Sequence, residues 1–158
     1  MLAAGLFQYY LLNIFIKNLF NKNPGNLFGI DIIVFELWAF RLLSFKKYPL
    51  EKIFPGDVFI YNDVYESAGT IGHLPDYCVV TPVFSEARLI GFAQIFGHVS
   101  DVGGRMAGSW PNTSESIFEE GTMCPPVKLY TSGELNSDLY DIILRNSRFP
   151  EDLRGDID

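Results

Sequence analysis

Runs of apolar residues alternate with turn-forming residues through the middle of the chain, in a pattern typical of a small antiparallel sheet. Three short runs are rich in Val, Ile, Phe and Tyr and are bounded by Gly, Pro, Ser or Asp: Asp57–Tyr61, Tyr77–Phe84 and Leu89–Phe96. This composition predicts three strands. Because the break at Ser85–Arg88 is short, we expect the second and third strands to pair as an antiparallel hairpin.

The second half of the chain adds one strand and a few helices. Val127–Tyr130 has a strand composition, and Ser116–Glu119 has the form of a capping box that opens a short helix. In Asp138–Asn146, apolar residues recur at helical spacing, which predicts an amphipathic helix. We expect the charged residues 148–158 to fray. The fold class predicted is therefore α+β, mainly an antiparallel sheet with a few helices.

Residues 1–45 differ from the rest, because they are strongly apolar and lack clean amphipathic spacing in their second half. Gln8, Asn13 and Lys17 interrupt the first apolar run, which argues against a membrane span. A basic start and a small-residue cleavage site are missing, which argues against a signal peptide. We predict an apolar helical segment over residues 1–45 and a separate body over residues 46–158.

The charge is distributed unevenly and limits the class of partner. The net charge is -7, and residues 1–50 carry +3 whereas residues 51–158 carry -10. An acidic body argues against nucleic-acid binding, which needs a basic surface. The two cysteines, Cys78 and Cys124, do not form a disulfide framework, so a reduced, cytoplasmic location is the default expectation.

The candidate chemistry lies around the hairpin. The chain has only two histidines, His73 and His98, and each is followed three residues later by an aspartate, Asp76 or Asp101. In a hairpin, the start of one strand lies beside the end of its partner, so these four side chains are expected to meet at one edge of the sheet. Asp63, just after the first strand, is expected to join them. Mixed nitrogen and oxygen ligands suit Zn, Mn or Fe better than Ca.

An ordinary structural interpretation stays open for each of these residues. An isolated loop histidine is usually a surface residue, and an aspartate after proline, as in Leu74-Pro75-Asp76, is common in turns. The glycines of Ser100–Asn112 allow either close backbone approach to a ligand or a plain irregular turn. Arg105 could pair with a substrate or phosphate oxygen, but the usual exposure of arginine favours an ordinary surface salt bridge. No residue is assigned as a nucleophile, acid or base.

Several motifs in a fixed order resemble the hydantoinase B/oxoprolinase family across roughly Pro49–Asp158. The matching segments are Asn62-Asp63, His73-Leu74-Pro75-Asp76, His98–Pro111, Ile117–Gly121, Pro125–Leu129 and Gly133–Asn136. Three departures from the family pattern stand out. Val64 replaces a proline, Gly97 replaces the first of two adjacent histidines, and residues 1–45 do not resemble the family's N-terminal region.

The resemblance implies an α+β enzyme part that works with an ATP-using partner of the hydantoinase A type. The pair would open a cyclic amide such as a hydantoin or 5-oxoproline, with ATP bound on the partner. A divalent metal on this chain is implied at Asp63, His73, Asp76, His98 and Asp101. Two alternatives are one component of an ATP-dependent ketone carboxylase and a non-catalytic fragment that only binds the A-type partner. Family chains are several times longer, so we expect this chain to be a fragment.

Overall fold

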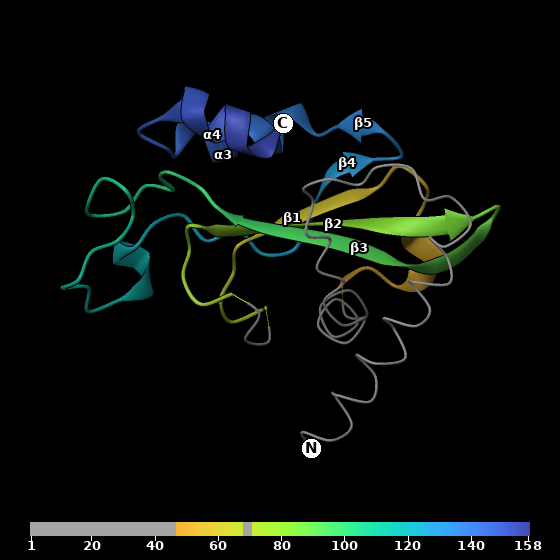
Figure 1. The fold of residues 1–158 in the computed structure, drawn as a ribbon, viewed down its shortest axis with the longest axis horizontal. Coiled ribbons are helices and arrows are strands. Elements are labelled where there is room, and N and C mark those ends of the chain that lie inside the picture. Colours follow the sequence, from red (N-terminus) through yellow and green to blue (C-terminus); the bar gives the residue numbers. More distant parts are fainter. Residues whose placement is uncertain (1–46, 68–70) are drawn as a thin grey trace, which may run out of the picture. The chain divides into compact units, whose positions relative to one another are not determined.

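The architecture is built on a five-stranded antiparallel sheet, described over residues 47–67 and 71–158 in a computed structural model (Figure 1). The strand order is β3-β2-β1-β4-β5, and every neighbouring pair is antiparallel. The strands are β1 (Val58–Tyr61), β2 (Asp76–Ser85), β3 (Arg88–His98), β4 (Val127–Thr131) and β5 (Glu134–Leu135). The helices are η1 (Leu50–Lys52), η2 (Ile117–Glu119), α3 (Ser137–Arg145) and α4 (Pro150–Ile157). The predicted α+β class is confirmed, whereas the predicted helical segment over residues 1–45 lies outside the described residues.

The predicted hairpin of β2 and β3 is confirmed and is longer than the sequence pattern indicated. Its register runs from Asp76 opposite His98 to Ser85 opposite Arg88, with one irregularity after Val83. Glu86 takes a positive φ of 56° in the tight turn between the strands. The extra length matters for the site, because it makes Asp76 and His98 directly paired residues at the end of the ladder.

The central strand β1 is buried on both of its faces, and neighbouring residues of a strand point to opposite faces. Phe59 and Tyr61 of β1 belong to one apolar cluster with Val80, whereas Ile60 between them belongs to a second cluster. Helices α3 and α4 contribute four buried side chains to that second cluster. These side chains are Tyr140, Ile143, Leu144 and Leu153. The helix pair therefore covers one face of the sheet.

The predicted helix over Asp138–Asn146 is confirmed as α3, one residue earlier at each end, and the Asn136 side chain caps it by accepting a hydrogen bond from Leu139 N at 3.1 Å. The prediction that residues 148–158 fray is wrong. They form α4, which starts with Pro150 at its first turn and buries Leu153 completely. Proline at the first helical turn is a normal start signal, and the buried leucine holds the helix against the core.

The predicted capping box at η2 is only half formed. Ser116 caps the helix by accepting a hydrogen bond from Phe118 N at 3.4 Å. The Glu119 carboxylate does not complete the box and instead contacts Arg105 at 3.3 Å. The expected surface salt bridge of Arg105 is thereby confirmed, and η2 is tied to the loop that follows β3.

A buried ion pair lies at the start of β1. The carboxylate of Asp57 has no exposed surface and lies 2.7 Å from Lys128 Nζ. Burial alone would raise the pKa of Asp57, but hydrogen bonds from Lys128, Phe54 N and Ser132 N lower it below the usual value. Asp57 therefore joins β1 to β4 and to the turn before β5.

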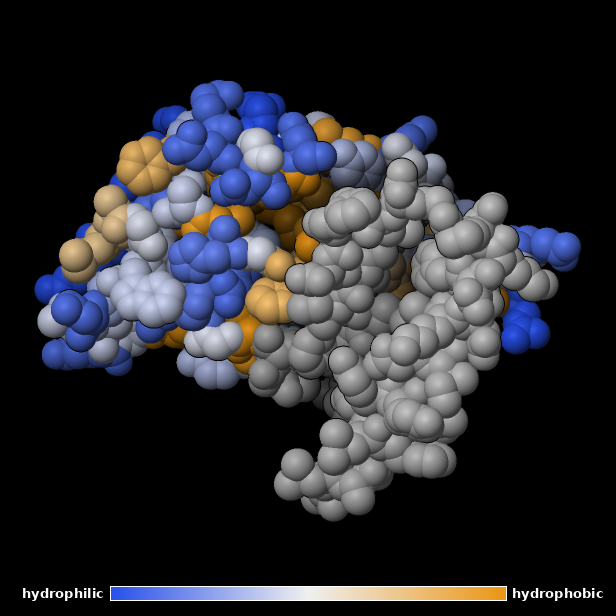
Figure 2. Space-filling view, in the orientation of Figure 1, coloured by the Kyte–Doolittle hydropathy of each residue, from blue (hydrophilic) through white to orange (hydrophobic). Residues whose placement is uncertain are grey.

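The two cysteines are free and buried. Burial raises the pKa of both thiols, to about 11 at Cys124. Within residues 47–67 and 71–158, no helix is long and apolar enough to cross a membrane. Figure 2 shows that hydrophilic residues dominate the visible surface of the described part, with apolar residues showing between them.

Candidate metal centre

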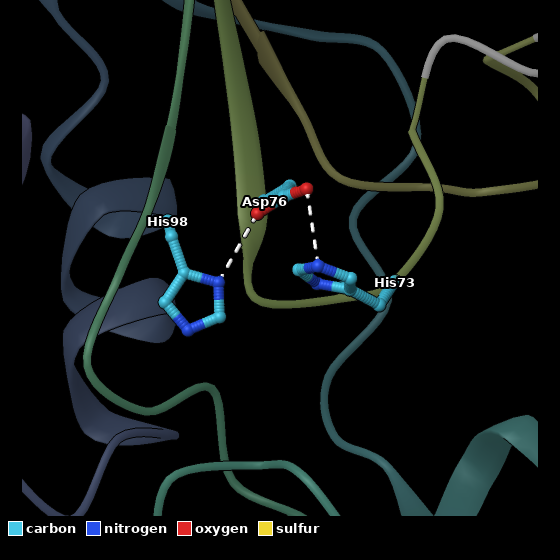
Figure 3. Close-up of side chains that lie close together, drawn as sticks. All are labelled: His73, Asp76 and His98. Atoms are coloured by element: carbon cyan, nitrogen blue, oxygen red, sulfur yellow. Dashed lines mark hydrogen bonds and ion pairs between the residues drawn. The ribbon is translucent and has the colours of Figure 1, made fainter.

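Asp76 lies between the two imidazole rings, at the end of the hairpin (Figure 3). Its Oδ2 is 3.3 Å from His73 Nε2, and its Oδ1 is 3.2 Å from His98 Nδ1. His73 comes from the loop before β2, Asp76 is the first residue of β2, and His98 is the last residue of β3. The strand ends bring together residues that are up to 25 positions apart, as the hairpin predicted.

The loop that carries His73 is fixed by backbone and side-chain hydrogen bonds. Asp76 N donates to His73 O at 3.2 Å, which closes the turn around Leu74 and Pro75. The fully buried Asn62 donates from Nδ2 to Leu74 O at 2.7 Å and accepts from Cys124 N at 2.6 Å. Asn62 therefore connects the end of β1, the His73 turn and the segment before β4.

The indole of Trp110 contacts both imidazoles. Its ring centroid is 4.6 Å from that of His73 and 5.9 Å from that of His98, while the two histidine rings are 5.2 Å apart. Nearby aromatic rings at these distances attract each other edge to face. Trp110 is itself 61% exposed, and the side chains of His73 and His98 remain 29% and 50% exposed beside it.

Asp63 lies outside this cluster and has a local structural role. Its Oδ1 accepts hydrogen bonds from Tyr65 N and Glu66 N, both at 2.9 Å. This is the turn-capping geometry common for aspartate. Among the described residues, the group whose donor atoms all lie within 4.8 Å of one another consists of His73, Asp76 and His98.

Asp101 also lies outside the cluster, and its carboxylate is fully buried. It accepts from Gly103 N and Gly108 N at 3.0 Å, and from Arg148 N and Arg148 Nη1 at 2.9 Å. Burial alone would raise the pKa of Asp101, but these hydrogen bonds and the guanidinium lower it below its usual value. Both of its oxygens are occupied within the fold.

The cluster of His73, Asp76 and His98 fits a transition-metal ion by its donor set and by the short distances between its donor atoms. Two imidazoles and a carboxylate are ligands that zinc and similar ions accept. The other ring nitrogen of His73, Nδ1, is buried and has no hydrogen-bond partner among the described residues, although a buried polar nitrogen normally has one. Two ligand atoms on one zinc ion lie at most about 4.2 Å apart, so the two histidine–carboxylate separations above are compatible with a shared ion.

Sequence reasoning missed two residues of this region, Trp110 and Arg148. Trp110 stands in a glycine-rich loop with no periodic pattern that would aim it at the histidines. Arg148 lies in the stretch that was expected to fray, although Pro150 and the acidic residues behind it were available as helix signals. A helix predicted there would have placed Arg148 in a short, ordered connection between two helices.

Comparison with known proteins shows what the chain resembles. The family model described as hydantoinase B/oxoprolinase matches residues 37–158. The chain is 38% identical over 112 residues to the protein MJ0963 of Methanocaldococcus jannaschii, which covers 71% of this chain and 19% of that protein. It is 40% identical over 83 residues to 5-oxoprolinase 1 of Arabidopsis thaliana, covering 52% of this chain and 6% of that protein.

A solved structure agrees with these sequence matches. The ATP-dependent caprolactamase from Pseudomonas jessenii superimposes with a TM-score of 0.62 at 32% identity, over 68% of this chain and 18% of that chain. The chain thus spans about a fifth or less of the length of these relatives. The family match covers most of the sequence and includes every residue of the candidate centre. The chain therefore belongs to the hydantoinase B/oxoprolinase family.

Proposed function

We propose that this chain supplies the metal-holding part of an ATP-coupled enzyme that opens a cyclic amide. The observation that carries the proposal is the cluster of two imidazoles around one carboxylate, His73, Asp76 and His98. It is supported by the names of relatives, since a 5-oxoprolinase and an ATP-dependent caprolactamase are among them. The family membership supports the class of enzyme, and the cluster supports the use of a metal ion in its reaction.

In this proposal His73 and His98 provide neutral nitrogen donors and Asp76 provides a negative oxygen donor. A divalent ion held there, Zn, Mn or Fe, would polarise a carbonyl oxygen or stabilise negative charge that develops on it. Trp110 contacts both imidazole rings and would help to hold them in place. Asp63 accepts hydrogen bonds at Oδ1 and Asp101 accepts them at both oxygens, so we assign both residues to support of the surrounding loops.

We propose that ATP is bound and used by a separate partner protein of the hydantoinase A type. One relative is named as the beta chain of a caprolactamase, a name that implies a second kind of chain in that enzyme. Activation of the amide oxygen by phosphorylation on the partner would make its carbonyl carbon easier to attack. The role of this chain would be to hold the activated ring and stabilise the charge formed when it opens.

Metal binding by the purified chain tests the first half of the proposal. We expect one equivalent of Zn²⁺ to bind. Loss of a residue that supports a ligand typically costs about 10- to 100-fold in affinity, so His73→Ala and His98→Ala, which each remove a ligand, should weaken binding by about 100-fold or more. Asp156→Asn removes an exposed carboxylate on α4 and serves as the control, with unchanged affinity. A wild-type chain that binds no Zn²⁺, Mn²⁺ or Fe²⁺ would eliminate the metal centre.

A coupled assay tests the second half. The chain is combined with an A-type partner, ATP and 5-oxoproline, a hydantoin or a ketone, with and without bicarbonate. Ring opening that depends on both proteins and on ATP supports the hydrolase. Product formed from the ketone only with bicarbonate would support the carboxylase alternative, and binding of the partner with neither product would support a non-catalytic fragment.

A further inference from the structure

The side chain of Arg148 binds the loop that follows β3 at four points. Its Nη1 donates to Asp101 Oδ2 at 2.9 Å, to Gly103 O at 3.0 Å and to Met106 O at 3.1 Å, and its Nη2 donates to Gly104 O. Arg148 lies in the connection between α3 and α4. This connection is at the same end of the sheet as the loop that follows β3 (Figure 1). One guanidinium therefore links the helix pair to the loop.

The loop from Asp101 to Ser109, called here the Asp101 loop, is also closed on itself. Ser109 Oγ accepts from Val102 N and donates to Gly103 O, both at 2.8 Å. Ser109 N donates to Met106 O at 3.1 Å. The two ends of the Asp101 loop are thus joined by hydrogen bonds of Ser109, and these bonds help to set the conformation of the loop.

Two glycines let the Asp101 loop lie against its neighbours. Gly103 and Gly104 have φ values of 91° and 77°, which non-glycine residues rarely adopt. A Cβ at Gly103 would lie 2.8 Å from Asn146 O, and one at Gly104 would lie 2.5 Å from Glu119 O. The loop is therefore packed between the end of α3 and η2, and it has little room to shift.

Trp110 is the residue that follows this closed loop. Ser109 is buried and forms hydrogen bonds through both its backbone N–H and its hydroxyl. The backbone from which the Trp110 side chain extends is therefore held in place. The indole then lies against His73 and His98 at the centroid distances of 4.6 and 5.9 Å given above. The path from Arg148 to the imidazoles is continuous: guanidinium, Asp101 loop, indole, histidine rings.

We propose that Arg148 is a positioning residue for the candidate metal centre and acts through Trp110. By fixing the Asp101 loop, it holds the indole against His73 and His98 and so keeps both rings in the orientation in which their nitrogens face Asp76. This inference rests on the proposed function for the metal, but its structural half, the control of Trp110 by Arg148, does not need the metal.

The reason for expecting an effect on the metal is that ligand orientation contributes to affinity. Imidazoles held by their surroundings lose less freedom when they bind an ion, and loss of such support typically costs about 10- to 100-fold in affinity. Arg148 touches neither histidine. An effect of its substitution on metal affinity that disappears when Trp110 is absent would be the signature of this route.

The test uses the full chain carrying Trp38→Phe, which leaves Trp110 as the sole tryptophan. Arg148→Lys keeps the charge but cannot reproduce the fork of donors. The matched control is Arg145→Lys, an exposed arginine at the end of α3. Near-ultraviolet circular dichroism and fluorescence report the surroundings of Trp110, and competition with a chromophoric chelator gives the Zn²⁺ affinity.

We expect Arg148→Lys to change the Trp110 signals and to weaken Zn²⁺ binding about 10-fold, while Arg145→Lys changes neither. Trp110→Ala should weaken binding to a similar extent, and the double variant should be no weaker than Trp110→Ala alone. Independent, multiplicative effects of the two substitutions would overturn the proposed route, as would Trp110 signals that are unchanged in Arg148→Lys.

The two proposals can fail separately. If the parent chain binds no metal, the proposed function fails, while changed Trp110 signals in Arg148→Lys would still support the positioning role. If the parent binds metal and Arg148→Lys leaves both readouts unchanged, only the positioning role fails. If Arg148→Lys does not fold, Ser109→Ala can replace it, because it removes the hydroxyl that bonds Val102 N and Gly103 O within the same loop. Changed Trp110 signals and weaker Zn²⁺ binding would again support the proposal, and unchanged signals and binding would overturn it.

Discussion

The two segments His73-x-x-Asp76 and His98-x-x-Asp101 have the same spacing, but their aspartates do different work. The side chain of Asp76 is 17% exposed and its two oxygens face two imidazoles. Asp101 is fully buried, and its oxygens face a guanidinium and three backbone N–H groups. The Asp76 carboxylate is accessible to a cation from solvent, whereas the Asp101 carboxylate is already paired with the guanidinium of Arg148.

The difference shows that spacing alone does not set the role of a carboxylate. Asp76 is in the strand ladder opposite His98, so the hairpin itself supplies its neighbours. Asp101 lies beyond the ladder, and its main partner comes from 47 residues further along the chain. Three predictions, from the largest expected effect to the smallest, test whether the two aspartates are as different as this comparison implies.

The largest effect is expected from Asp101→Ala. It leaves three buried N–H groups and a partly buried guanidinium without their acceptor, so the free energy of unfolding should fall by about 3 kcal/mol. Urea unfolding followed by far-ultraviolet circular dichroism measures this loss. A loss below about 1 kcal/mol, as is usual for exposed ion pairs, would remove the contrast with Asp76.

A second, smaller effect is expected from acid. The pKa values of Asp101 and Asp57 are both lowered in the folded chain, whereas an unfolded aspartate titrates near pH 3.9. Each carboxylate therefore contributes stability that is fully present above about pH 4 to 5 and is lost as the pH falls through its lowered, folded pKa.

Urea unfolding at pH 7 and at pH 3 measures this acid effect. The loss of stability between the two should be smaller in Asp57→Asn and in Asp101→Asn, because neither amide titrates. Equal losses in the parent and in both variants would place the acid sensitivity in other groups.

The smallest effect is expected from Asp76→Ala in the presence of a chelator. The carboxylate and both histidines are partly exposed, so the free energy of unfolding should change by less than about 1 kcal/mol. The same urea titration detects the change. A loss as large as that of Asp101→Ala would mean that Asp76 stabilises the fold as strongly as Asp101 does. Asp76 would then be a structural residue, and the case for it as a metal ligand would weaken.

The hairpin and its histidine edge were predictable from the sequence because they depend on local rules. Alternating β-branched residues and a short break predict paired strands, and pairing brings His73 beside His98. Asp101 was grouped with them by its spacing from His98, and Asp63 by its place just after the first strand. Neither feature reveals that nearby N–H groups donate hydrogen bonds to these carboxylates. Arg148 and Trp110 were not predictable, because their contacts depend on an irregular loop and on helix α4.

The distance along the chain between the centre and its support has a consequence for the order of events during synthesis. The hairpin with both imidazoles is complete by His98, whereas Arg148 lies 47 residues beyond Asp101. At about 5 to 20 residues per second, a ribosome needs several seconds to add that stretch. Arg148 is therefore added only after His73, Asp76 and His98 have all been synthesised, so the contacts that it makes with the Asp101 loop form late in synthesis.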